Sequence, residues 1–290
     1  MPTLPQPDVF LPPSRPLLEH TILDPWLAPE FCDPTPLPTR RRPARSPDDQ
    51  ALYDRCATDV AHFATTFFPH LCTTAFSSMH EDFFAQYAAD GDARGLRDAT
   101  AAPRGFAKTT VRGKIKILHD CVYELERYIL VISSRDDLAI DKVKDIREEF
   151  ETNARLIAVY GRQVGRLWNM GDFITTQGVR VRAASRGSQV RGLLWGTYRV
   201  TKIVLDDAEN SELVLTDLQR QKMVAWFTED ITKLGDEHTN IEVIGTVLHE
   251  DSLLAKLLHN PGYRQARYQA VLTFASAVPL WQQWRDLFLD

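Results

Sequence analysis

Ala102-Pro103-Arg104-Gly105-Phe106-Ala107-Lys108-Thr109-Thr110 is the stretch of sequence from which the fold can be worked out. It has the spacing of a phosphate-binding loop, G-x-x-x-x-G-K-[ST], with alanine at both positions that are usually glycine. Gly105 still supplies backbone freedom, and Lys108 can reach phosphate oxygens beside the backbone N–H groups of a helix N-terminus. A surface turn before an amphipathic helix would give the same pattern, so the interpretation needs support from other segments.

The sequence after this loop alternates helical periods with short apolar runs. The helix that starts at the loop has apolar residues at spacings of four, three and four: Val111, Ile115, Leu118 and Val122. A continuous apolar run typical of a buried strand occupies Tyr128–Ile132. Two more candidate core strands are Ile203–Leu205 and the segment with Ile241, Val243 and Ile244. The alternation predicts an α/β fold with a central, mostly parallel sheet flanked by helices.

Several local signals predict where individual elements begin. A helix is expected from about Asp49 to Phe68, and the Ser-x-x-Glu pattern of Ser78–Glu81 predicts another helix start. After the first apolar run, Ser134 and Asp137 are candidate helix caps, and the inner face of that helix is expected to consist of Ile140, Val143, Ile146 and Phe150. The segments Phe173–Thr176 and Val179–Arg182, joined by Gln177-Gly178, predict a hairpin.

A second chemical signal is the apolar run Lys202–Leu205, which ends in Asp206-Asp207 with Glu209 close behind. At the carboxyl edge of a parallel sheet these carboxylates would lie beside a bound phosphate. Asp206 is expected to hold a magnesium ion together with Thr109, and Asp207 to orient the attacking water, with Glu209 as the alternative acid. Acids at a strand end are also common turn-formers and helix caps.

A third signal is the run Ile241–Ile244, which stops at Gly245-Thr246. A hydroxyl at a strand tip can sense whether a γ-phosphate is present and pass the difference to neighbouring elements. An ordinary strand-to-helix turn is the alternative interpretation of Thr246.

Composition limits the classes of protein to which the chain can belong. With 290 residues, 44% of them hydrophobic, it can bury a substantial core. The net charge of −5 argues against a protein that coats nucleic acid along its whole surface, so any contact with DNA must be local or shared among subunits. Two arginine clusters are candidates, although charge runs are often only solvated: Arg40, Arg41, Arg42 and Arg45, and Arg180, Arg182, Arg186 and Arg191.

The termini and the cysteines suggest where the protein works. Residues 1–48 are rich in proline and are expected to form an extended arm, followed by one domain over residues 49–290. The four cysteines are scattered without a C-x-x-C pair, and there is neither a signal peptide nor an apolar run long enough to span a membrane. A reduced cytosolic protein is expected.

Across roughly residues 60 to 285, the order of these segments resembles the ATPase domain of tailed-bacteriophage terminase large subunits. The segments that carry the resemblance are Phe76–His80, Arg104 four positions before Lys108, Ala184–Gly192, Leu205–Asn210 and Gly245–Thr246. The resemblance implies a P-loop NTPase of the ASCE or RecA-like type that binds ATP and Mg²⁺.

The resemblance also implies roles for individual residues. Those expected to bind the nucleotide are Arg104, Gly105, Phe106, Ala107, Lys108, Thr109, Thr110 and Thr246. The metal ligands are expected to be Thr109 and Asp206, and the catalytic candidates are Asp207, Arg191, Arg104 and Glu209. Arg191 would act as an arginine finger on a neighbouring subunit's ATP, or else form a salt bridge to the acidic strand of its own subunit.

The partners implied by the resemblance are double-stranded DNA, further copies of the chain in a ring, the capsid portal and the terminase small subunit. The resemblance also implies that the protein works in the host cell cytoplasm and is not part of the mature virion. Family members usually continue into a nuclease, for which the residues after Pro279–Trp281 leave no room. The chain is therefore expected to be either a truncated terminase or one half of a split terminase with a separate nuclease chain, and to have ATPase activity without DNA cleavage. The competing hypotheses are a fragment of a superfamily-2-like helicase and a nucleotide-binding adaptor that does not hydrolyse ATP.

Overall fold

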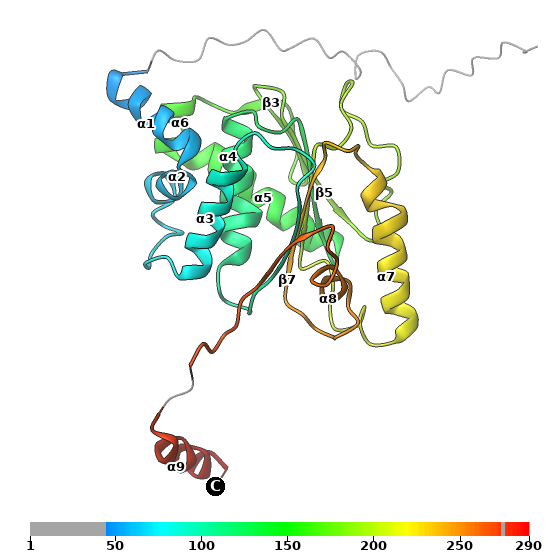
Figure 1. The fold of residues 1–290 in the computed structure, drawn as a ribbon. Coiled ribbons are helices and arrows are strands. Elements are labelled where there is room, and N and C mark those ends of the chain that lie inside the picture. The colour runs from blue at the N-terminus through cyan, green and yellow to red at the C-terminus, as the bar shows by residue number, and fades with distance from the viewer. Residues whose placement is uncertain (1–44, 274–275, 290) are drawn as a thin grey trace, which may run out of the picture. The chain divides into compact units, whose positions relative to one another are not determined.

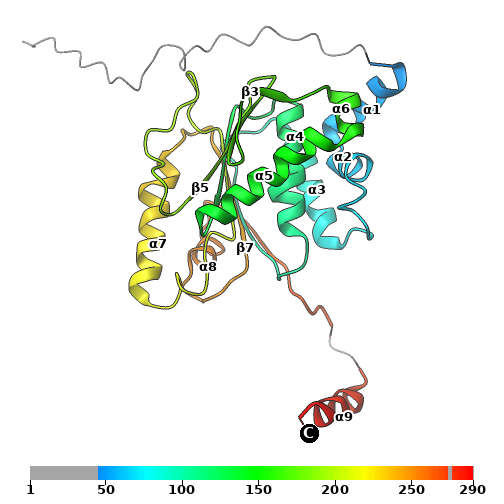
Figure 2. The same cartoon turned by 180° about the vertical axis from the view of Figure 1, so that it is seen from behind.

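The computed structural model describes residues 45–273 and 276–289, so nearly all of the arm predicted for residues 1–48 lies outside the described residues. A central sheet is covered on one face by α2 (Val60–Phe67), α3 (Ser78–Asp90) and α5 (Asp136–Thr152). Helices α7 (Asp217–Glu229) and α8 (Leu253–Leu257) cover the other face (Figures 1 and 2). The predicted α/β fold is thereby confirmed at the level of a mostly parallel sheet between helices.

The sheet has eight strands in the order β3-β4-β5-β2-β6-β7-β1-β8. The strands are β1 (Arg97–Ala101), β2 (Tyr128–Ser133), β3 (Val164–Trp168), β4 (Asp172–Thr175), β5 (Arg180–Ser185), β6 (Lys202–Asp206), β7 (Asn240–Gly245) and β8 (Arg264–Arg267). Only the β3-β4 and β4-β5 pairs are antiparallel. Since β7 pairs with both β1 and β6, the carboxyl ends of these three strands lie side by side.

The remaining helical elements are α1 (Pro47–Thr58), η2 (Thr109–Ile115), α4 (Lys116–Val122), α6 (Ala154–Tyr160), η3 (Ile231–Lys233) and α9 (Val278–Leu289). Buried apolar side chains form two clusters, one containing residues of α2, α3, α4 and α5, the other residues of α7 and α8. Strand β2 contributes alternate residues to both, with Ile129 and Val131 in the first and Leu130 and Ile132 in the second. This double burial explains why its sequence is continuously apolar.

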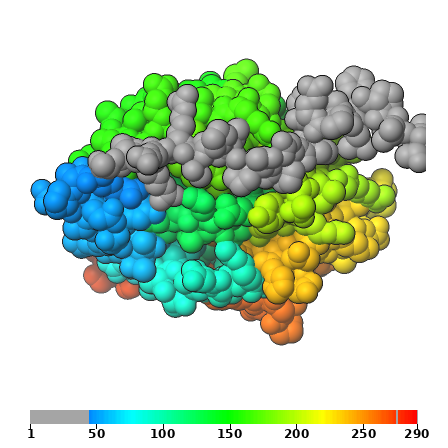
Figure 3. Space-filling view, turned by 90° about the horizontal axis from the view of Figure 1, so that it is seen from above, coloured from blue at the N-terminus to red at the C-terminus, as the bar shows by residue number. Residues whose placement is uncertain are grey.

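The first described residues are packed against the domain. Helix α1 lies beside α6 (Figures 1 and 2), with Arg155 and Asp49 paired at 3.3 Å. The surface of these first described residues is blue in Figure 3. Arg45 Nε donates to Val159 O at 2.8 Å, and its guanidinium lies 3.7 Å from the centre of the Tyr53 ring. Arg45 is therefore a packing residue, whereas the other three arginines of its sequence cluster lie outside the described residues.

Several predicted helix boundaries were wrong. Two helices occupy the Asp49–Phe68 region, because Asp59 interrupts it and caps α2 through the His62 backbone N–H. Ser77, not Ser78, caps α3, and its backbone N–H donates to His80 Nδ1 at 3.2 Å, so that His80 replaces the expected glutamate.

The helix after β2 also differs from the prediction. Neither Ser134 nor Asp137 caps α5, whose N-cap is Arg135. Ile140 is 37% exposed, and Ala139 takes its place beside the buried Val143. The predicted hairpin is confirmed by the antiparallel pairing of β4 and β5 around Gly178, which has φ +84°.

No helix within residues 45–273 and 276–289 combines the length and apolar character that a membrane crossing needs.

Candidate functional site

The loop between β1 and η2 turns sharply at two residues with left-handed backbone conformations. Gly105 has φ +80°, and a Cβ built there would meet nothing within 4 Å. Ala107 has φ +52°, a conformation that costs a non-glycine residue about 1–2 kcal/mol. Alanine thus adopts a backbone shape that glycine would adopt more readily, immediately before Lys108. Such local strain is often found at functional sites.

The helix that follows the loop begins with a π-helical segment, η2, and continues as α4. A Cβ on Gly113 would lie 3.2 Å from Asp206 Oδ2, so glycine permits this segment to pass close to the end of β6. The same segment presents the hydroxyl of Thr109, which donates to Asp206 Oδ1 at 2.9 Å. Short π-helical segments within helices frequently occur at functional sites.

The two consecutive acids at the end of β6 have different surroundings. Asp206 is fully buried, and burial raises the pKa of its carboxyl, an effect that Lys142 partly offsets. Asp207 has φ +49°, which turns the chain after the strand, and its side chain is 46% exposed. Asp207 Oδ2 lies 3.7 Å from Lys108 Nζ. The loop and the acidic strand therefore meet through two separate pairs of side chains.

Thr246 follows β7, which separates β1 from β6 in the sheet. Its hydroxyl accepts a hydrogen bond from Lys108 Nζ at 3.4 Å and donates one to Ala102 O at 3.1 Å. Thr246 thus connects the lysine of the loop to the strand that precedes the loop. The hydroxyl of Thr246 therefore lies beside the position of any group that Lys108 binds.

Lys108, Thr109, Asp207 and Thr246 border an open cleft of about 490 Å³, a volume within the range of about 300–1,000 Å³ that is common for small-molecule sites. The fully buried Asp206 lies behind Thr109 and is not among the residues that line the cleft. Its lining residues come from the loop, β2, α5 and the ends of β6 and β7: Arg104, Gly105, Phe106, Ala107, Lys108, Thr109, Ser133, Ser134, Leu138, Lys142, Asp207, Glu209, Asn210, Ser211, Thr246 and Leu248. Thr110, which the sequence prediction included, is half-buried and does not line the cleft. The cleft lies at the carboxyl edge of the parallel strands, where open α/β sheets bind their ligands.

Glu209 borders the cleft, but its carboxylate is engaged elsewhere. Its two oxygens accept hydrogen bonds from the backbone N–H groups of Leu253 at 2.8 Å and Leu254 at 3.1 Å, at the start of α8. Burial raises the pKa of Glu209, and these two hydrogen bonds oppose the rise. The alternative prediction of Glu209 as the water-orienting acid is therefore disfavoured, because its carboxylate holds a helix terminus.

The two candidate arginines have different positions. Arg104 is exposed on the loop and borders the cleft. Arg191 does not border it: its side chain is 78% exposed and pairs with Asp230 at 2.7 Å, at the end of α7. The predicted alternative of a salt bridge from Arg191 to the acidic strand is wrong, because the partner is Asp230.

Two further residues around the cleft carry polar chemistry that the sequence patterns did not indicate. Lys142 Nζ lies 2.7 Å from Asp206 Oδ2 and donates to Asp206 O at 2.7 Å, and Ser133 Oγ donates to the same carbonyl at 3.1 Å. Lys142 belongs to a helix whose lysines and acids resemble an ordinary solvated face, and one helical turn before it Leu138 also borders the cleft. The spacing of four residues places Leu138 and Lys142 on the same face of α5, and it is the sequence signal that could have indicated the position of Lys142.

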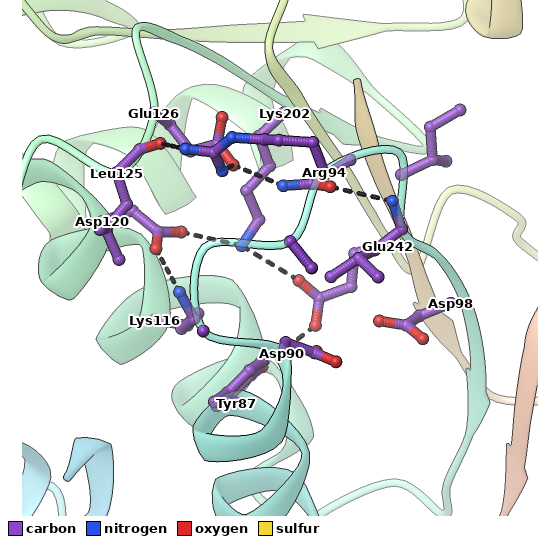
Figure 4. Close-up of a pocket in the computed structure, with 15 residues that line it drawn as sticks. Tyr87, Asp90, Arg94, Asp98, Lys116, Asp120, Leu125, Glu126, Lys202 and Glu242 are labelled. Atoms are coloured by element: carbon purple, nitrogen blue, oxygen red, sulfur yellow. Dashed lines mark hydrogen bonds and ion pairs between the residues drawn. The ribbon is translucent and has the colours of Figure 1, made fainter. Parts of the chain in front are cut away.

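The opposite edge of the sheet contains a second, much smaller hollow of about 50 Å³, shown in Figure 4. Lys202 Nζ lies 2.8 Å from Asp120 Oδ2 and 3.4 Å from Glu242 Oε2, and Tyr87 donates to Glu242 at 3.1 Å. Burial opposes the ionisation of Asp120, but Lys116 and Lys202 lower the pKa of Asp120 to about 2. Because the charges are paired and the space suits only water, we interpret this cluster as structural.

Compared with known proteins, the chain matches no family model and has no significant sequence match among curated proteins.

Proposed function

We propose that this chain is a Mg²⁺-dependent ATPase of the P-loop, ASCE-type fold and acts as the motor domain of a viral genome-packaging terminase. The observation that carries the ATPase proposal is the convergence of the loop with the acidic strand, in which Thr109 contacts Asp206 at 2.9 Å and Lys108 lies 3.7 Å from Asp207. A lysine, a hydroxyl and two carboxylates at the start of a helix are the groups that bind and hydrolyse a magnesium–triphosphate.

The sheet order supports the fold part of this proposal. Strand β7 lies between the loop strand β1 and the acidic strand β6, and all three run parallel. Their carboxyl ends therefore bring Ala102, Thr246 and Asp206 to one edge, although they are far apart in the sequence. This arrangement is consistent with the ASCE type of P-loop protein.

The donor set around Asp206 fits a magnesium ion. Asp206 Oδ2 is buried and lies 2.7 Å from the Lys142 ammonium, and the Thr109 hydroxyl is next to the other carboxylate oxygen. Mg²⁺ prefers hard oxygen ligands and usually takes one or two carboxylates besides water and phosphate oxygens. When bound, it would supply charge neutralisation for the phosphates; Thr109 and Asp206 would hold it.

The remaining residues divide the chemistry of hydrolysis. Lys108 neutralises charge on the outer phosphates, and the exposed carboxylate of Asp207 orients the attacking water and accepts its proton. Loss of the terminal phosphate changes what Lys108 and Thr246 contact, which can move β7 relative to the loop.

The motor part of the proposal depends on the resemblance to terminases together with the position of Arg191. An exposed arginine that does not border the cleft of its own subunit is available to a neighbouring subunit's nucleotide, as a ring-forming motor requires. In this role the chain would couple ATP hydrolysis to the movement of double-stranded DNA into a capsid, with a portal and a terminase small subunit as partners.

An ATPase assay on concentrated protein with Mg²⁺ tests the enzymatic proposal. Wild type should hydrolyse ATP, and Lys108→Ala should lose hydrolysis together with most nucleotide binding, because the loop lysine supplies charge to the phosphates. Lys144→Met, an exposed change on α5, is the matched control and should behave like wild type. Equal, minimal hydrolysis by wild type and Lys108→Ala at concentrations where wild type binds ATP would instead favour the adaptor hypothesis.

A further inference from the structure

Lys142 occupies the position in the cleft that is closest to the buried carboxylate of Asp206. It comes from the second turn of α5, and its side chain is 21% exposed. Its ammonium lies 2.7 Å from Asp206 Oδ2 and donates to the main-chain oxygen of the same residue at 2.7 Å. The contact joins α5 to the end of β6, two elements that are far apart in the sequence.

The two oxygens of this carboxylate have different partners. Oδ1 accepts the hydrogen bond of Thr109, whereas Oδ2 is ion-paired with the Lys142 ammonium at 2.7 Å. An ionised carboxylate that is fully buried requires a nearby positive charge, since its desolvation is costly. Lys142 supplies that charge.

The other cations that border the cleft are directed elsewhere. Lys108 Nζ is next to Asp207 and Thr246, and Arg104 has no ion pair with any residue of the described ranges. A divalent cation at Asp206 would therefore compete with Lys142 for the same oxygen. Two positive charges a few ångströms apart repel strongly in a partly desolvated site.

We propose that Lys142 is a resident counter-cation of Asp206 that makes Mg²⁺ binding depend on the simultaneous presence of a triphosphate; this inference rests on the proposed ATPase function. Without nucleotide, a metal ion has to displace the ammonium from Asp206 into a cleft whose other carboxylates are already engaged, Asp207 beside Lys108 and Glu209 at the start of α8. With nucleotide, the long and flexible lysine side chain can move to phosphate oxygens and leave Asp206 to the metal.

The proposal predicts an effect opposite to that of a simple structural role. If Lys142 only holds Asp206 in place, removal of its charge weakens metal binding. If Lys142 competes with the metal, removal of its charge strengthens the binding of metal alone and reduces the dependence of metal binding on nucleotide. By thermodynamic reciprocity, metal and nucleotide then also promote each other's binding less in the variant.

Mn²⁺ binding, read from the electron paramagnetic resonance signal of the free ion, distinguishes these roles. Without nucleotide, Lys142→Met should bind Mn²⁺ roughly ten-fold more tightly than wild type, within the range of about 5- to 150-fold typical of coupled sites. The double variant with Asp206→Asn should lose this gain. With a saturating non-hydrolysable ATP analogue, the affinities of wild type and Lys142→Met for Mn²⁺ should approach each other. Lys144→Met is the control and should match wild type throughout.

Unchanged or weaker Mn²⁺ binding by folded Lys142→Met in the absence of nucleotide overturns the inference. If Lys142→Met lacks a cooperative thermal transition, Lys142→Gln makes the same comparison, because its amide can still donate to the Asp206 carbonyl without a positive charge. If wild type and Lys144→Met bind Mn²⁺ but not the analogue, both the inference and the proposed function fail. If both ligands bind to wild type without promoting each other, the inference alone fails.

Discussion

Asp206 and Asp207 are adjacent in the sequence but differ in exposure, backbone conformation and partners. Asp206 ends a strand inside the sheet and is fully buried between Thr109 and Lys142. The left-handed backbone of Asp207 turns its carboxylate into the cleft, near Lys108. Burial and a fixed geometry suit a metal ligand, whereas partial exposure suits a group that must contact water.

The difference between Asp207 and Glu209 gives a prediction at the scale of single residues. Asp207→Asn should lower the turnover of ATP by about 10²–10⁴-fold, the usual effect of removing a general base, without loss of nucleotide binding. Glu209→Gln should retain most of the turnover but lower the thermal stability, because it weakens the interactions at the start of α8. Steady-state ATPase rates and melting curves of both variants test this. The reverse pattern, with turnover lost in Glu209→Gln and kept in Asp207→Asn, would exchange the assigned roles.

Residue patterns predicted the loop and the acids but not all of their surroundings. Lys108, Thr109, Asp206, Asp207 and Thr246 could be selected because their spacing along the chain is distinctive, and the structure brings them together. The contact of Lys142 with Asp206 depends on how α5 is rotated over the sheet, which one sequence does not specify. The partner of Arg191 likewise depends on the position of α7.

At the scale of elements, α4 contains a buried histidine that makes the packing of the N-terminal helices sensitive to acid. His119 Nε2 donates to Cys56 O at 2.9 Å in α1, and the ring packs against Phe63 and Tyr123. Nδ1 is buried without a hydrogen-bond partner in the described residues, so a second proton there would be unpaired. Burial, assisted by Lys116, lowers the pKa of His119 to about 4.

This pKa shift predicts a loss of stability at mildly acidic pH. The folded pKa lies below the unfolded value of 6.5, so the unfolded state binds the proton more readily as the pH falls from about 6.5 to 4. His119 should therefore contribute a loss of about 2 kcal/mol between pH 7 and 4.5. Urea unfolding at both pH values should show a smaller acid-induced loss in His119→Phe than in wild type, even if the variant is less stable at pH 7. An equal loss in both proteins would assign the acid sensitivity to other groups.

The strands differ in how readily they can be predicted. Strands β2, β6 and β7 are buried on both faces and are mainly apolar, which made them recognisable although β7 includes the buried Glu242. Strands β1 and β8 were missed, because they are short and carry Arg97, Asp98, Arg264 and Arg267. Arg264 pairs with Asp98 at 2.6 Å, so these charges stabilise the pairing of the two strands, which a pattern of apolar residues cannot reveal.

At the scale of the whole molecule, the proposed motor requires contact between copies. Arg191 is exposed and held by Asp230 at the end of α7, outside its own cleft. An arginine that acts on a neighbour's nucleotide would have to exchange this exposed ion pair for phosphate oxygens. Exposed pairs typically contribute only about 0–1 kcal/mol, so the exchange would cost little.

A mixing experiment tests this arrangement. Arg191→Ala should keep ATP binding and lose about 10³–10⁵-fold in turnover, as expected for an arginine finger. A mixture with Lys108→Ala should recover part of the activity, because an intact arginine from one variant can act on nucleotide bound by the other. Exposed Arg199→Ala serves as a control of equal charge and should keep wild-type turnover. Failure of folded, co-assembled variants to complement each other would place Arg191 in its own subunit or outside the reaction.

The most direct test of the central claim is an experimental structure of the wild-type chain with a non-hydrolysable ATP analogue and Mg²⁺. We predict a triphosphate over Ala107–Thr109 with Lys108 on its outer oxygens and a metal ion beside Thr109 and Asp206. Bound nucleotide elsewhere on the molecule, or an empty cleft with the contacts of Lys108 unchanged at saturating analogue, would contradict the assignment of this cleft as an ATP site.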